Sequence, residues 1–100
     1  MKSLHINGYN VKNVVLDILE KYPDIRDTLE YENLQELYID YTMSCDLHEQ
    51  QAWMKHYISS ALSRLEHSTN MIIQKKYNSK DELEFEAFLE IIVAYDLLGD

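Results

Sequence analysis

Few residues in this chain could carry chemistry, and the first to consider are Cys45 and His48, which form a Cys-x-x-His pair. A zinc site would need two further soft ligands at matching spacing, because structural zinc takes four. His56 and His67 are the candidates, and neither is paired with a second cysteine. We therefore expect no metal site and no cofactor.

Cys45 could also act as a nucleophile, but only as a thiolate. Asp46 follows it directly, and this negative neighbour should raise rather than lower the thiol pKa. Serines and histidines share one face of a predicted helix at His56, Ser59, Ser63 and His67. Such a face is more often solvated surface than a catalytic pair, and two glycines cannot build a phosphate-binding loop. We expect no catalytic residue and no enzyme activity.

The carboxylates, in contrast, repeat at helical spacing. Glu82, Glu86 and Glu90 form a row with about 6 Å of rise per step, and Glu36 and Asp40 form a similar pair. Like charges at this spacing repel each other by roughly a few tenths of a kcal/mol. Three explanations are open. The rows are a solvated face that keeps the protein soluble, they imitate the phosphates of a nucleic acid, or they pair with a basic part of a second subunit.

Charge is also sorted along the sequence, whose net charge is −9. Residues 17–49 carry ten acids and two bases, residues 50–80 one acid and five bases, and residues 81–100 seven acids and no base. This balance disfavours direct binding to nucleic acid or to an anionic membrane and favours a basic protein partner. The predicted contact residues are Asp24, Asp27, Glu30, Glu36, Asp40, Glu82, Glu86 and Glu90.

The elements that position these residues are predicted to be helices, because two glycines and one proline leave few turns. Asn10 can cap a first helix, whose apolar stripe runs from Val11 to Tyr22 and which Pro23 ends. The apolar residues between positions 24 and 45 do not continue the stripe of this first helix. We expect a short helix near 24–31, a kink around Glu32-Asn33 and then a helix to about Ser44.

Asp46 and Glu49 form a capping box that opens the next helix. This helix either runs unbroken to about Tyr77 or breaks near residues 68–70. A second box, Ser79 with Glu82, opens a last helix that should reach Leu98. Apolar residues cover more than half of this last helix, so it is either central to the domain or buried by another subunit.

These patterns predict a single all-α domain over residues 1–100, a compact bundle of four or five helices. Leu4 and Ile6 alternate with polar residues before the Asn7-Gly8 turn signal, so residues 1–9 form a short strand or an arm. One cysteine allows no internal disulfide and favours a cytoplasmic location. Eight tyrosines suit either an interface or packing at the edge of a core.

The segment Tyr22-Pro23-Asp24-Ile25-Arg26-Asp27-Thr28, followed by an acidic helical stretch, resembles the acidic DNA-mimic antirestriction proteins of phages, of the Ocr type, and some small phage anti-CRISPR proteins. The resemblance implies an inhibitor of a host defence nuclease that acts in the host cytoplasm, with Asp24 and Asp27 as mimic carboxylates. The basic block at residues 50–80 departs from the Ocr pattern. A mimic confined to two acidic patches is compatible with that departure.

The leading functional hypothesis is a non-catalytic binding protein that blocks a basic, nucleic-acid-handling protein by charge mimicry. The alternative is a structural or assembly subunit that acts through homo-oligomerisation, with a dimer formed through the last helix.

Overall fold

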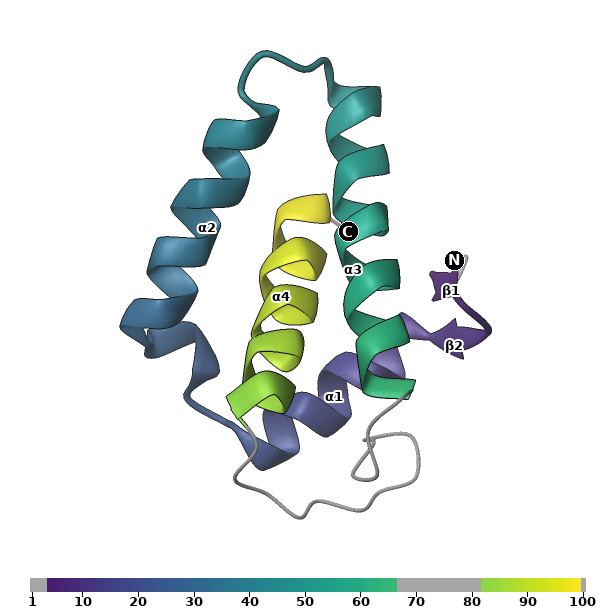
Figure 1. Ribbon diagram of the computed structural model, residues 1–100, viewed down its shortest axis with the longest axis vertical. Helices are drawn as coiled ribbons and strands as arrows, with labels where there is room; N and C mark the ends of the chain where they lie inside the picture. Colours follow the sequence, from purple (N-terminus) through teal and green to yellow (C-terminus); the bar gives the residue numbers. More distant parts are fainter. Residues whose placement is uncertain (1–3, 67–81, 100) are drawn as a thin grey trace.

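A computed structural model describes residues 4–66 and 82–99, with the side chains of 82–84 left out. Within these residues the chain is a helical bundle, as the sequence predicted, and a small pair of strands precedes the helices (Figure 1). In chain order the elements are β1 His5–Ile6, β2 Tyr9–Asn10, α1 Val11–Lys21, the 3-10 helix η1 Ile25–Asp27, α2 Leu29–Thr42, α3 Leu47–Glu66 and α4 Glu82–Leu98.

The N-terminal residues form a hairpin in which β1 and β2 pair antiparallel, with Ile6 opposite Tyr9. Asn7 and Gly8 both adopt positive φ, at 55° and 84°, which a two-residue turn of the favoured twist requires. The Asn7 side chain donates to the Ser59 carbonyl at 3.0 Å and accepts from the Ser59 hydroxyl at 3.0 Å. The strand expected for residues 1–9 is therefore present and is anchored to α3.

Helix α1 begins and ends at the predicted signals. The Asn10 side chain accepts a hydrogen bond from the Asn13 backbone N–H at 3.3 Å and so caps the first turn. The helix stops at Lys21, two residues before Pro23. Its apolar stripe is buried at Val11, Val14, Val15 and Ile18.

The break predicted at Glu32-Asn33 is wrong, because α2 runs continuously through both residues. The chain breaks at Thr28 instead, after a 3-10 turn rather than a helix over 24–31. The Thr28 hydroxyl accepts from the Tyr31 N–H at 3.1 Å and donates to the Ile25 carbonyl at 2.7 Å. One side chain thus closes η1 and caps α2.

The remaining helix ends agree with the sequence where they are described. Asp46 accepts from the Glu49 N–H at 2.8 Å and opens α3, and Gly99 follows α4 with a positive φ of 74°. The two alternatives for residues 67–77 and the Ser79 cap lie outside the described residues.

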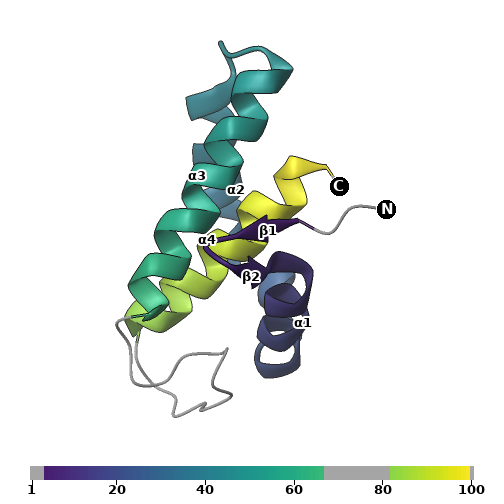
Figure 2. The ribbon, with the colours of Figure 1, turned by 90° about the vertical axis from the view of Figure 1, so that its right-hand side faces the viewer.

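Helix α4 is the centre of the bundle. Figure 1 shows α4 between α2 and α3, which diverge from the turn that joins them, and Figure 2 shows α1 on the opposite side of α4 from α2 and α3. Among the α4 side chains that the structure describes, from residue 85 on, seven are buried: Ala87, Phe88, Leu89, Ile91, Ile92, Val93 and Ala94. Its wide apolar surface is therefore largely covered by other helices of the same chain. Of the two possibilities that the sequence left open for this helix, the central position in the domain is the one observed.

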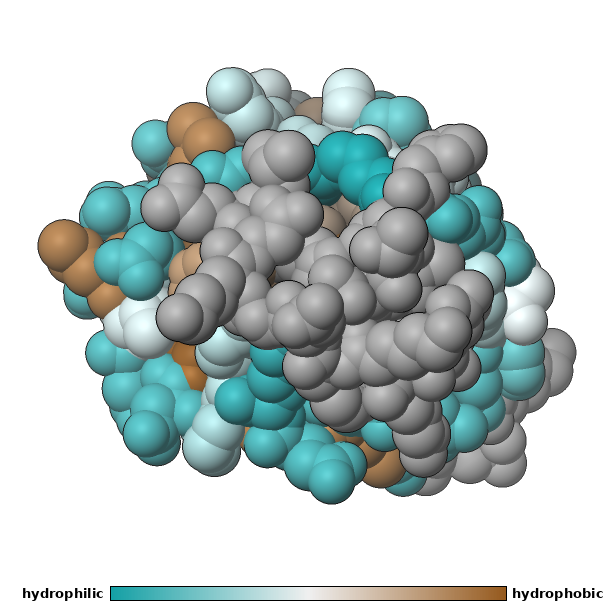
Figure 3. All heavy atoms as spheres, turned by 60° about the horizontal axis from the view of Figure 1, so that its bottom comes forward, coloured by the Kyte–Doolittle hydropathy of each residue, from teal (hydrophilic) through white to brown (hydrophobic). Residues whose placement is uncertain are grey.

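The described surface differs between the two ends of the bundle. At the end nearest α1 and the start of α4 it is mainly hydrophilic, with hydrophobic side chains in small separate areas (Figure 3). Exposed large apolar side chains gather near the turn between α2 and α3, at Ile39, Tyr41, Met43 and Leu47. Over residues 4–66 and 82–99, no helix has the length and apolar character needed to cross a bilayer.

Candidate partner-binding groove

The predicted contact residues fall on three elements. Asp24 directly precedes η1 and Asp27 is its last residue, Glu30, Glu36 and Asp40 lie on α2, and Glu86 and Glu90 lie on α4. Glu82 is the first residue of α4, and its side chain lies outside the described part of the structure.

Six of these carboxylates are exposed and make no ion pair or side-chain hydrogen bond to any described residue: Asp24, Asp27, Glu30, Glu36, Asp40 and Glu86. Residues 24–40 hold six acids and one base, Arg26, which is bound to Asp96. Glu30 and Glu32 also have a structural reason for their charge, since acids in the first turn favour the helix N-terminus. Asp24, Asp27, Glu36 and Asp40 make no ion pair with a described residue, so they can meet an external partner.

Glu90 differs from these six because its charge is compensated inside the molecule. It forms an ion pair with the Arg64 guanidinium of α3 and accepts a hydrogen bond from the Tyr38 hydroxyl at 3.2 Å. Its side chain is only 22% exposed. Glu90 therefore ties α2, α3 and α4 together, and it offers less free charge to a partner than Glu86 does.

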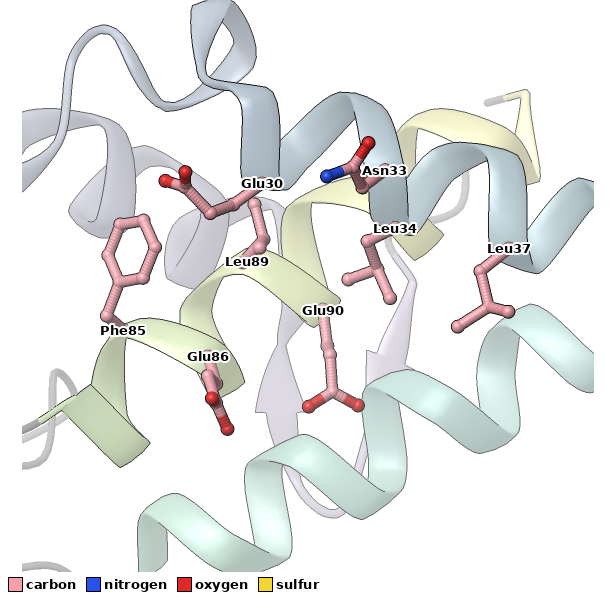
Figure 4. Close-up of a pocket in the computed structure, with 8 residues that line it drawn as sticks. All are labelled: Glu30, Asn33, Leu34, Leu37, Phe85, Glu86, Leu89 and Glu90. Carbon is pink, nitrogen blue, oxygen red and sulfur yellow. The ribbon is translucent and has the colours of Figure 1, made fainter.

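The structure brings Glu30, Glu86 and Glu90 to one groove of about 660 Å³ between α2 and α4 (Figure 4). Four apolar side chains and one amide complete the lining: Leu34, Leu37, Phe85, Leu89 and Asn33. In Figure 4, Leu34 and Leu37 descend from α2, Glu30 lies near the Phe85 ring, and Glu90 is directed toward α3. The groove thus combines an apolar floor with carboxylates from two acidic segments far apart in the sequence.

Charge spacing alone did not identify the apolar half of this site. Leu34 and Leu37 lie at helical spacing with Tyr38 and Tyr41, and such an apolar stripe normally faces a core. Leu37 remains 44% exposed, although the next residue, Tyr38, is buried and stacks on Tyr57 of α3. The helical spacing of the leucines is present in the sequence, but only the packed structure shows that part of the stripe faces solvent.

Next to Glu90, aromatic rings of α2 and α3 pack against each other. The Tyr38 and Tyr57 rings stack with centroids 4.1 Å apart and planes 10° apart, and Trp53 lies 5.9 Å from Tyr57. Burial, and then the neighbouring Glu90 carboxylate, raises the pKa of Tyr38 well above its ordinary value. Tyr38 therefore stays a neutral hydrogen-bond donor to Glu90 and holds α2 against α3.

The chemistry considered for Cys45 is not supported by its surroundings. Burial, and then a hydrogen bond to Glu49, raises the thiol pKa, whereas an activated nucleophile needs it lowered. Ser59 and Ser63 of the serine-histidine face bond to Asn7 instead of to a histidine. No group of three metal-ligating side chains occurs among the described residues, and His67 lies outside them.

Comparison with protein-family models, with curated proteins and with solved structures finds no match to this chain. The resemblance of residues 22–28 to Ocr-type proteins therefore stays a prediction.

Proposed function

We propose that this chain is a non-catalytic binding protein that blocks a basic, nucleic-acid-handling protein by presenting carboxylates to its positively charged surface. The observation that supports this most directly is the set of exposed, uncompensated carboxylates on η1 and α2. Asp24, Asp27, Glu36 and Asp40 form no ion pair with a described residue, and Arg26, the nearest base in the sequence to Asp24 and Asp27, is bound to Asp96.

Such a surface acts through long-range attraction. Opposite charges steer the two proteins together and raise the association rate, and salt screens the effect over about 10 Å at 0.1 M. Binding should therefore be fast and should weaken as the salt concentration rises. Because the partner surface normally holds phosphates, bound nucleic acid and this protein should compete for it.

The resemblance of the Tyr22–Thr28 segment gives the proposal a more specific form, a phage-borne inhibitor of a host restriction or CRISPR nuclease. In that form Asp24 and Asp27 occupy positions that phosphates occupy in the nuclease–DNA complex. The acting compartment is the host cytoplasm.

The experiment uses the immobilised chain and the DNA-binding fraction of a bacterial extract, enriched on DNA-cellulose. We expect proteins to be retained at low salt and displaced by a double-stranded oligonucleotide. The matched variant carries Asp24→Asn, Asp27→Asn, Glu36→Gln and Asp40→Asn, which keep the side-chain shapes and remove four charges. Loss of DNA-displaceable retention in this variant supports the proposal. Equal retention by both proteins, or retention that DNA does not displace, contradicts it.

Homo-oligomerisation, the alternative hypothesis, keeps the sorting of charge along the sequence as support and loses most of the support from α4. Among the described residues, most apolar side chains of α4 are buried, and α1, α2 and α3 of the same chain pack against this helix. Light scattering at rising protein concentration tests it directly, with a concentration-dependent dimer as the supporting result.

A further inference from the structure

We infer that the groove between α2 and α4 receives one amphipathic, basic α-helix of the partner protein. This inference rests on the proposed function, since it takes the partner to be basic, and it adds the form of the segment that docks.

The apolar floor of the groove favours apolar side chains on the helix that docks there. Leu34, Leu37, Phe85 and Leu89 line it, and two of them come from a stripe on α2 with helical spacing, Glu30, Leu34 and Leu37 at i, i+4 and i+7. A helix packs its own ridges of side chains into the space between two helices. Helices that dock in this way present apolar residues at i, i+3, i+4 and i+7.

The carboxylates at the rim of the groove favour a positively charged helix. Glu30 stands on α2 and Glu86 on α4, so carboxylates border the apolar floor on both sides. No lysine or arginine is among the described residues that line the groove. Lysine and arginine lay their aliphatic stems along apolar surface and keep the charged end at the edge. A helix with lysine or arginine beside its apolar stripe can pack on the apolar floor and pair with the carboxylates of the rim at the same time.

Other occupants fit the lining less well. A nucleic acid or an anionic lipid would bring phosphates against Glu30 and Glu86, and like charges repel. An uncharged apolar helix would fill the floor and leave both carboxylates without a partner. The combination of charge and apolar area therefore favours a basic amphipathic helix.

The test compares two fluorescein-labelled peptides of about 18 residues, both built from the same numbers of leucine and lysine. One peptide places its leucines on a single helical face, and the other has a scrambled order without such a face. Fluorescence anisotropy at low and moderate salt measures their affinity. We expect the amphipathic peptide to bind about tenfold more tightly than the scrambled one.

Matched variants locate the site. Leu37→Ser, in the groove, should weaken binding of the amphipathic peptide about fivefold, whereas Leu29→Ser should not, because Leu29 is 64% exposed and lies outside the groove. Glu30→Gln with Glu86→Gln should weaken it more than Glu36→Gln with Asp40→Asn. Both leucines are exposed, so folding should survive either change, which circular dichroism checks.

The two proposals fail in different ways. Equal affinity for both peptides, or equal effects of the two leucine variants, overturns the helix-in-groove inference and leaves the proposed function intact. Absence of salt-dependent binding to either peptide, together with no DNA-displaceable retention of a protein partner, overturns both. If the chain alone dimerises and Leu37→Ser abolishes the dimer, the occupant is a second copy and the inference is overturned.

Discussion

Arg26 and Asp96 lie 70 residues apart in the chain and bind each other through two parallel hydrogen bonds, from Nε to Oδ2 at 2.8 Å and from Nη2 to Oδ1 at 2.9 Å. The Tyr31 hydroxyl donates to the same carboxylate at 2.8 Å. One side chain of α4 therefore fixes both η1 and the first turn of α2, where Asp24, Asp27 and Glu30 are presented.

Replacing this carboxylate should loosen that end of the molecule. We expect Asp96→Asn to lower the free energy of unfolding by about 1–2 kcal/mol, a modest loss because Arg26 is 44% exposed and solvent screens the pair. Urea denaturation followed by circular dichroism measures it. Asp40→Asn is the matched control, since Asp40 is exposed and makes no ion pair with a described residue, and its effect should be near zero. Equal effects of the two variants would contradict the assigned role.

The tyrosines predict a loss of stability in alkali. Burial, and then a hydrogen bond to Asp96, raises the pKa of Tyr31 to about 12, and burial also raises the pKa of Tyr38. The folded state therefore keeps these protons above pH 10, where tyrosines of the unfolded chain lose theirs. Stability should be fully present below pH 10 and should fall as the pH rises beyond it. Unfolding free energies that stay constant from pH 8 to about 11 would contradict this.

Cys45 should react slowly with thiol reagents. Burial and the Glu49 carboxylate raise its pKa, so the thiolate fraction near pH 8 is below that of a free cysteine. Stopped-flow measurement with an aromatic disulfide, against an unstructured cysteine peptide, gives the comparison. Glu49→Gln should lower the thiol pKa and speed the reaction, and Glu36→Gln should leave it unchanged. A wild-type rate equal to that of the peptide would show that these contacts have no effect.

Charge reversal should separate Glu86 from Glu90. Glu90→Lys sets a second cation against Arg64 and removes the acceptor of the Tyr38 hydroxyl, so the free energy of unfolding should fall by about 2 kcal/mol. Glu86→Lys changes an exposed residue and should cost less than about 0.5 kcal/mol. Thermal unfolding distinguishes them. A folded, equally stable Glu90→Lys variant would mean that the Arg64 and Tyr38 contacts contribute little.

Much of the fold could be predicted because its signals are local. The Asn10 cap, Pro23, the Asp46 cap and Gly99 each act within a few residues of a helix end, and the structure places helix ends at all four. The predicted break was placed at Glu32-Asn33 instead of at Thr28, because the capping role of Thr28 was not recognised. A change in the phase of the apolar stripe shows that a break exists, but the capping hydroxyl fixes where it lies.

The site could be predicted only in part. The positions of its carboxylates can be taken from the sequence, whereas the shape of the groove depends on how the helices pack. Helical spacing picked out Glu86, and the acidic stretch over residues 17–49 included Glu30. Nothing in the sequence near Glu90 shows that Arg64 on another helix neutralises it, since that pairing depends on how α3 packs against α4. The apolar floor also depends on packing, because helical spacing does not show that Leu37 stays 44% exposed in a groove beside α4.

The central position of α4 has a consequence for biosynthesis. The helices α1, α2 and α3 all pack against residues 82–98, which the ribosome adds after the residues of those three helices. Until that segment emerges, the apolar faces of the earlier helices have no surface to bury against, and short isolated helices are marginal in water. The chain should therefore acquire its core late and in one step, rather than helix by helix during translation.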